Sequence, residues 1–138
     1  MSQERVSPDP EKEHGKPGRE SWVAHFFKAA GYSIAGIGTA LRHEMAFRME
    51  VVAVVLLAPV AILLPVSLVF KALILSSMVI VLVAELLNSA IECVVDYISK
   101  EKHPLAKRAK DMGSAAVLFA LVNSGVMWAL ALWEWWTF

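Results

Sequence analysis

The chain has 138 residues, enough for one domain, and 57% of them are hydrophobic. Its charged side chains balance to a formal net charge of zero, which gives no indication of a nucleic-acid partner. The single cysteine, Cys93, excludes an internal disulfide framework and a cysteine metal cluster. Because Cys93 lies in an apolar run, we expect it to be a small buried residue.

The first part of the chain is polar, and the next part carries apolar residues at helical spacing. Residues 1–20 combine charged side chains with prolines and offer almost nothing to bury, so we expect a disordered polar tail in the cytoplasm. Residues 21–41 place Val23, Phe27 and Ile34 on one helical stripe. This pattern predicts an amphipathic helix lying on the cytoplasmic leaflet of a membrane.

Three apolar segments follow, and each suits a membrane span. The first runs from about 43 to 64 and ends before Pro65, which favours a tight turn. The second, about 66–98, is longer than the hydrocarbon layer requires and should project beyond it. The third, about 112–136, ends among tryptophans, which are typical of a membrane–water boundary. We therefore predict an all-α membrane protein with one surface helix and three spans.

Lysine and arginine are distributed unevenly along the chain. Seven lie at or before Arg48, five lie between 100 and 110, and only Lys71 lies elsewhere. Positive residues favour the cytoplasmic side, so the N-terminus and the second connection should be cytoplasmic and the C-terminus should lie outside.

Four polar residues interrupt the second span. On a helix that turns by about 100° per residue, Glu85, Asn88, Glu92 and Asp96 fall at about 0°, 300°, 340° and 20°. They share one narrow face. Carboxylates are costly at membrane depth, so this face predicts a working site.

Further charged residues should lie at the same membrane face. Glu44 and Glu50 lie at the mouth of the first span, and the cluster 107–111 precedes the third. Carboxylates with basic residues suit Mg²⁺ and phosphate. Alternatives stay open: the basic cluster also obeys the positive-inside rule, the two glutamates also suit snorkelling, and Asp96 also suits a helix end that pairs with the basic loop.

The chain has no phosphate-binding glycine loop and no protein-kinase signature. One rival interpretation is a small proton-coupled transporter subunit, because intramembrane glutamates also relay protons. That interpretation predicts polar residues along the full depth of the spans, whereas here they gather on the cytoplasmic side. A non-catalytic assembly subunit would leave Glu85 without a purpose.

Four strings carry a resemblance to a known family: 29–33 (AAGYS), 44–48 (EMAFR), 85–92 (ELLNSAIE) with 94–96 (VVD), and 108–117 (RAKDMGSAAV). Over about residues 22–136 the chain resembles the small integral-membrane diacylglycerol kinases of bacteria. The resemblance implies a homotrimer in the inner membrane, each subunit with a surface helix and three spans. It also implies transfer of the γ-phosphate of MgATP to a lipid hydroxyl, which makes phosphatidic acid.

The resemblance implies roles for the matching residues. Glu85 would be the general base and Asn88 would position that base or the substrate, while Glu44 and Glu92 would bind the divalent metal. Besides those two glutamates, the nucleotide contacts would be His25, Tyr32, Glu101, Lys102, His103, Lys110 and Asp111. The lipid contacts would be Ala29, Ala30, Gly31, Ser33, Phe47, Arg48, Glu50, Glu85, Ser114 and Trp128.

The chain departs from the family pattern at a few positions. His25 stands where the family usually carries an arginine, and Gly38 stands where a basic residue is common. The loop 102–107 (KHPLAK) resembles a branch that phosphorylates undecaprenol, whereas 111–116 (DMGSAA) fits the diacylglycerol branch better. We therefore expect a diacylglycerol kinase, with an undecaprenol kinase as the alternative.

Overall fold

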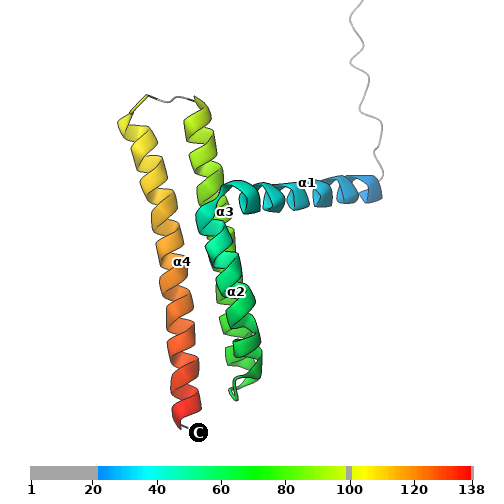
Figure 1. Ribbon diagram of the computed structural model, residues 1–138, viewed down its shortest axis with the longest axis vertical. Helices are drawn as coiled ribbons and strands as arrows, with labels where there is room; N and C mark the ends of the chain where they lie inside the picture. The colour runs from blue at the N-terminus through cyan, green and yellow to red at the C-terminus, as the bar shows by residue number, and fades with distance from the viewer. Residues whose placement is uncertain (1–21, 99–100, 138) are drawn as a thin grey trace, which may run out of the picture. The chain divides into compact units, whose positions relative to one another are not determined.

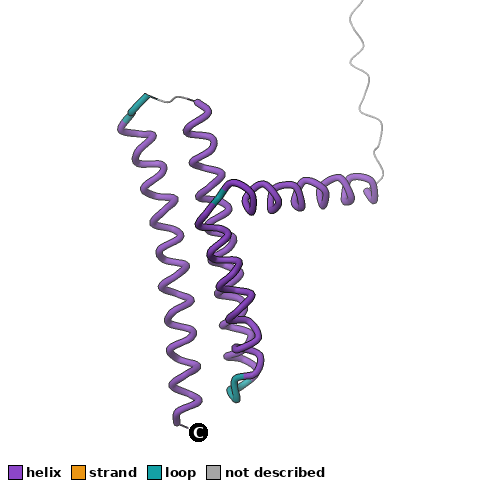
Figure 2. Tube along the Cα trace, in the orientation of Figure 1, coloured by secondary structure: helices purple, strands orange, loops and turns teal. Residues whose placement is uncertain are grey.

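The computed structural model describes residues 22–98 and 101–137. The predicted disordered tail, residues 1–20, lies outside the described residues. The described chain forms four α-helices joined by short loops, and no strand occurs within it (Figure 2). The predicted all-α class is confirmed.

The first helix, α1, spans Trp22–His43. Its large apolar side chains, among them Trp22, Phe26 and Ile34, are exposed and so are available to a membrane surface. That α1 lies on such a surface stays a prediction. Residues up to Ser33 form one compact unit and those from Ile34 onward form a second, and each is described by itself.

The other three helices are α2 (Met45–Leu63), α3 (Leu68–Ile98) and α4 (Pro104–Thr137). All three are long and apolar enough to cross a membrane, as the three predicted spans require. α4 begins earlier than the predicted span at 112, because the polar residues before the apolar segment continue the same helix. A proline suits this first helical position, where its missing N–H would have no partner within the helix.

α3 is the central helix of the second unit, with α2 and α4 packed against it (Figure 1). A buried cluster of Ala61, Ile74, Met78 and Ala131 joins the three helices near the α2–α3 turn. Ser77, which is 2% exposed, lies 3.2 Å from Ser124 in a side-chain hydrogen bond that links α3 to α4. Apolar packing therefore gathers at one end of the bundle and leaves the other end to polar residues.

The α2–α3 turn is held by two charged side chains. The predicted bend at Pro65 is confirmed. The Lys71 ammonium donates to the carbonyl of Ile62 at 2.7 Å, which satisfies one of the free carbonyls at the end of α2. The backbone N–H of Ser67 donates to Glu134 at 3.0 Å, which ties the turn to the end of α4.

The prediction that Cys93 is buried is wrong, since the structure exposes it. Among the described helices, α2 and α4 pack against α3. They leave Cys93 exposed. An apolar run in a membrane helix is compatible with exposure to lipid as well as with burial, so the sequence pattern did not distinguish the two.

Candidate active site

The predicted polar face of α3 forms a gradient from buried to exposed. Glu85 is 5% exposed, and Asn88 and Glu92 are half-buried. Asp96, two to three turns further along the helix, has a side chain that is 63% exposed. A molecule arriving from water would meet Asp96 first, and only a group entering between the helices would reach Glu85.

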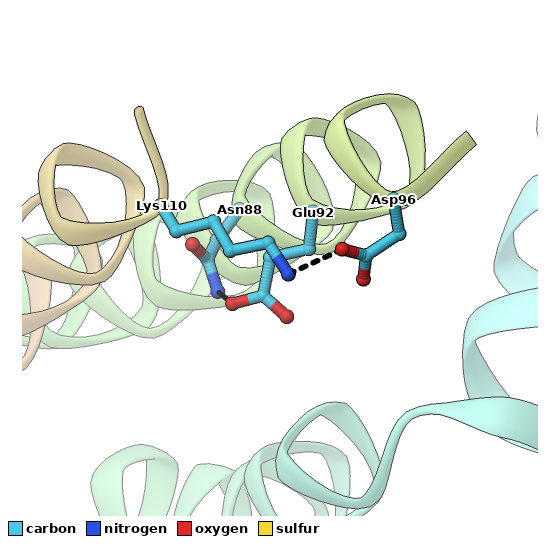
Figure 3. Close-up of polar contacts among 4 residues, drawn as sticks. All are labelled: Asn88, Glu92, Asp96 and Lys110. Carbon is cyan, nitrogen blue, oxygen red and sulfur yellow. Dashed lines mark hydrogen bonds and ion pairs between the residues drawn. The ribbon is translucent and has the colours of Figure 1, made fainter. Parts of the chain in front are cut away.

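Two hydrogen bonds organise this face, as Figure 3 shows. The Asn88 carboxamide donates from Nδ2 to Glu92 Oε1 at 3.4 Å. Lys110 reaches across from α4, and its ammonium donates to Asp96 Oδ1 at 2.7 Å. This contact agrees with the alternative in which Asp96 pairs with the basic residues that precede the third span.

Glu44 stands at the break between α1 and α2. It has extended backbone angles, φ −101° and ψ 114°, and its side chain makes no capping hydrogen bond to α2. The Arg48 guanidinium donates to the carbonyls of Leu41 at 3.4 Å and Arg42 at 3.0 Å. Arg48, predicted to contact lipid, therefore stabilises the end of α1. Because the Glu44 side chain does not cap α2, its carboxylate is available for other partners.

Four carboxylates form an acidic cluster: Glu44 at the break between α1 and α2, Glu50 of α2, and Glu85 and Glu92 of α3. Coulomb repulsion acts on Glu85 from Glu92 and Glu44, and on Glu50 from Glu85. The Oε2 atom of Glu50 is buried and has no hydrogen-bond partner. Such a cluster attracts cations, because a positive charge placed near it relieves the mutual repulsion.

A cavity of about 700 Å³ opens beside the α3–α4 connection. Five residues predicted to contact nucleotide line it together with Asp96: Glu101, Lys102, His103, Lys110 and Asp111. Besides Lys110, His103 and Asp111 also have structural contacts. His103 Nδ1 accepts the N–H of Leu105 at 3.2 Å and so caps α4, and Asp111 pairs with Lys107 one turn earlier. The cavity therefore joins the N-terminus of α4, which favours anions, to basic side chains.

An apolar groove runs between α2, α3 and α4. Glu50 and Trp128, both predicted to contact lipid, line it among aliphatic side chains such as Val54 and Leu121. Phe47 is instead buried at 3% exposure, and Ser114 is exposed outside the lining. The groove thus combines an apolar wall with one carboxylate at its edge.

Six further predicted contacts belong to the first part of α1: His25, Ala29, Ala30, Gly31, Tyr32 and Ser33. Ala30 is half-buried and the others are exposed, and Ser33 donates from its hydroxyl to the carbonyl of Ala29 at 3.2 Å. These residues lie in the first unit, so their part in the site stays a prediction.

Comparison with known proteins identifies the family. The family described as Prokaryotic diacylglycerol kinase matches residues 31–132. This chain belongs to that family. The diacylglycerol kinase of Escherichia coli (strain K12) is 50% identical over 107 residues, which cover 78% of this chain and 88% of that protein. The diacylglycerol kinase of Pseudomonas aeruginosa is 48% identical over 127 residues, 92% of this chain and 98% of that protein.

The relationship extends to more distant members. The diacylglycerol kinase of Haemophilus influenzae is 41% identical over 106 residues, 77% of this chain and 90% of that protein. Membership of the diacylglycerol kinase family makes this chain a lipid kinase, and it favours the kinase interpretation over the transporter one.

One residue of this diacylglycerol kinase family member was not singled out from its sequence. Gly113 of α4 is buried, and a side chain there would meet Asn88 of the polar face. Gly113 belongs to the string 108–117, which indicated the family. The residues around it in the sequence do not show which residue of α3 it faces. Only the packing of α4 on α3 reveals that contact.

Proposed function

We propose that this protein transfers the γ-phosphate of ATP to the primary hydroxyl of diacylglycerol, which gives phosphatidic acid. The observation that carries the proposal is Glu85, a carboxylate only 5% exposed in a helix long and apolar enough to span a membrane. Placing a carboxylate at membrane depth costs free energy, so such a residue usually has a function. Family membership supports the same reaction.

Glu85 acts as the general base. It accepts the proton of the lipid hydroxyl as that oxygen attacks the γ-phosphorus, and the bond from the γ-phosphorus to the bridging oxygen breaks to leave ADP. Phosphoryl transfer depends mainly on positioning and on neutralising phosphate charge. Lys110, on the rim of the 700 Å³ cavity, supplies positive charge for that purpose. Asn88, between Glu85 and Glu92, positions the acidic groups.

Glu44 and Glu92 are the proposed metal ligands. No group of three or more His, Cys, Asp or Glu side chains is arranged to hold a metal within residues 22–98 and 101–137. Two carboxylates nevertheless fit Mg²⁺, which uses one or two of them and completes its coordination with phosphate oxygens and water. When bound, Mg²⁺ would neutralise phosphate charge. The repulsion within the acidic cluster supports a cation there.

The two substrates approach from different sides in this proposal. The nucleotide occupies the cavity at the N-terminus of α4, where Lys102 and Lys110 face it. The acyl chains of the lipid lie in the apolar groove beside Trp128, with the headgroup end toward Glu50. The hydroxyl then meets Glu85 without leaving the membrane boundary, and this arrangement suits a substrate that is held in lipid.

We also propose a homotrimer in the bacterial inner membrane, with a cytoplasmic N-terminus and an outer C-terminus. The distribution of lysine and arginine supports this orientation, because these residues favour the cytoplasmic side. In this orientation the proposed nucleotide cavity faces the cytoplasm, where ATP is found. Within residues 22–98 and 101–137 of one chain, the helices that pack on α3 are α2 and α4. Its partly exposed polar face supports further cover from a neighbouring subunit.

The decisive experiment measures phosphatidic acid formation from ATP and diacylglycerol in mixed micelles. Glu85→Gln keeps the size of the side chain and removes its basicity, so we expect a near-complete loss of rate with unchanged folding. Glu134→Gln is the matched control, because Glu134 lies at the far end of α4 and its replacement can still accept the Ser67 N–H. Full activity of Glu85→Gln would remove Glu85 as the base.

A second candidate substrate is undecaprenol, which the loop 102–107 favours. Both lipids present a primary hydroxyl at the membrane boundary, so the same site chemistry serves either. The same assay with undecaprenol distinguishes them. We expect faster turnover of diacylglycerol, and faster turnover of undecaprenol would overturn the choice.

A further inference from the structure

Gly113 occupies a point of close approach between α4 and α3. A Cβ atom built on it would collide with Asn88 Oδ1, and it would lie 3.4 Å from Asn88 Cγ and 3.6 Å from Asn88 Cα. The same addition at Gly36 meets nothing within 4 Å. The absence of a side chain at Gly113 therefore creates the space that the Asn88 carboxamide fills.

The Asn88 carboxamide has two ends with different surroundings. Its oxygen is buried against Gly113 and has no hydrogen-bond partner among the residues that the structure describes. Its nitrogen donates to Glu92 Oε1 at 3.4 Å. Because the oxygen and the nitrogen belong to one planar group, a movement of the oxygen away from α4 also displaces the nitrogen from its present place, where its distance to Glu92 Oε1 is already 3.4 Å.

We propose that Gly113 is a positioning residue for the metal site: by leaving room for the Asn88 oxygen, it holds the Asn88 nitrogen on the Glu92 carboxylate. This inference rests on the proposed role of Glu92 as a metal ligand. Groups that hydrogen-bond to a ligating carboxylate orient it, and their loss typically lowers metal affinity by about 10- to 100-fold. Gly113 acts one contact further out, through Asn88.

The simpler role for a buried glycine is to let two membrane helices pack closely. That role predicts that a methyl group at Gly113 lowers stability whatever residue stands at 88. The positioning role predicts that its effect on metal affinity depends on the Asn88 carboxamide. The two roles therefore differ in a quantity that can be measured.

The test measures Mn²⁺ affinity by electron paramagnetic resonance with a non-hydrolysable ATP analogue on the full-length protein. We expect Gly113→Ala to raise the dissociation constant for Mn²⁺ by about tenfold. Asn88→Ala should raise it similarly, and the double variant should equal Asn88→Ala alone, since the methyl group then has nothing to displace. Gly36→Ala, the same change in an open position, should leave the constant unchanged.

Four outcomes would contradict the inference or the metal role on which it rests. An unchanged constant for Gly113→Ala, or effects of the two changes that multiply in the double variant, would overturn the positioning role alone. No Mn²⁺ binding by the wild type would overturn the proposed metal role of Glu92 itself. If Gly113→Ala does not fold, Asn88→Leu fills the same space without a donor, and an unchanged constant in that variant would also overturn the inference.

Discussion

Lys110 is the charged side chain that joins α4 to the polar face of α3. Its ammonium lies 2.7 Å from Asp96, with side chains that are 35% and 63% exposed. An ion pair with this exposure contributes little to folding, because water competes for both groups. Lys110 can therefore exchange Asp96 for a phosphate without destabilising the fold, and it already lines the cavity where we place the nucleotide.

Replacing Lys110 should weaken nucleotide binding. A hydrogen bond to a charged group is worth about 1.5–3 kcal/mol, so Lys110→Met should raise the KM for ATP by roughly 10- to 100-fold. Lys107→Met removes the same charge from a pair that lies within one helix turn, and its effect should be smaller. The ATP dependence of both variants, measured at saturating lipid, checks this. Equal effects would mean that only the overall positive charge matters.

At the scale of the element, the position of Glu44 depends on the two helices that it joins. It is the one residue between α1 and α2 that is not helical, and the helices on either side determine where its carboxylate lies. The Arg48 guanidinium satisfies two carbonyls at the end of α1, Leu41 and Arg42, which would otherwise lack partners in the helix. We infer that this contact stabilises the junction that presents Glu44.

Arg48→Gln should therefore loosen the junction. Glutamine is shorter, so its amide nitrogen does not reach the two carbonyls that Arg48 Nη1 contacts, and the end of α1 loses these bonds. We expect faster hydrogen exchange of the amides of residues 44–48. Arg42→Gln is the control, because it removes the same charge and keeps the backbone carbonyl that Arg48 contacts. Equal exchange in Arg48→Gln and the wild type would show that the guanidinium does not hold the junction.

At the scale of the whole molecule, the buried apolar cluster and the proposed nucleotide cavity lie at opposite ends of the bundle formed by α2, α3 and α4. The buried cluster around Ile74 lies near the α2–α3 turn, and the 700 Å³ cavity lies beside the α3–α4 connection. The lysines and arginines of the membrane segments follow the same division, with only Lys71 on the side of the turn. A chain divided in this way has one preferred orientation in a membrane.

The orientation can be tested with the single native cysteine removed. In a Cys93→Ala background, Thr137→Cys should react with a membrane-impermeant thiol reagent added to intact spheroplasts. Lys102→Cys should react only after the membrane is opened, because the connection between α3 and α4 should face the cytoplasm. The reverse pattern of labelling would invert the proposed topology and place the nucleotide cavity away from ATP.

The sequence by itself determined the helical class, the three spans and the common face of Glu85, Asn88 and Glu92. These features depend on apolar length and on the helical repeat, and both are local properties of the chain. The family strings added the activity. The exposure of Cys93 and the start of α4 at Pro104 were not predicted, because they depend on which surfaces neighbours cover and on where polar residues continue a helix.

Only the tertiary structure decided which residues of α4 meet the polar face of α3. The pairing of Lys110 with Asp96, and the contact of Gly113 with Asn88, both depend on the register of one helix against the other. Neither helix encodes that register in its own periodicity, because sliding one along the other leaves both apolar patterns intact. The sequence therefore identified the groups to which we assign the chemistry, and the packing of α4 on α3 determined how they are held.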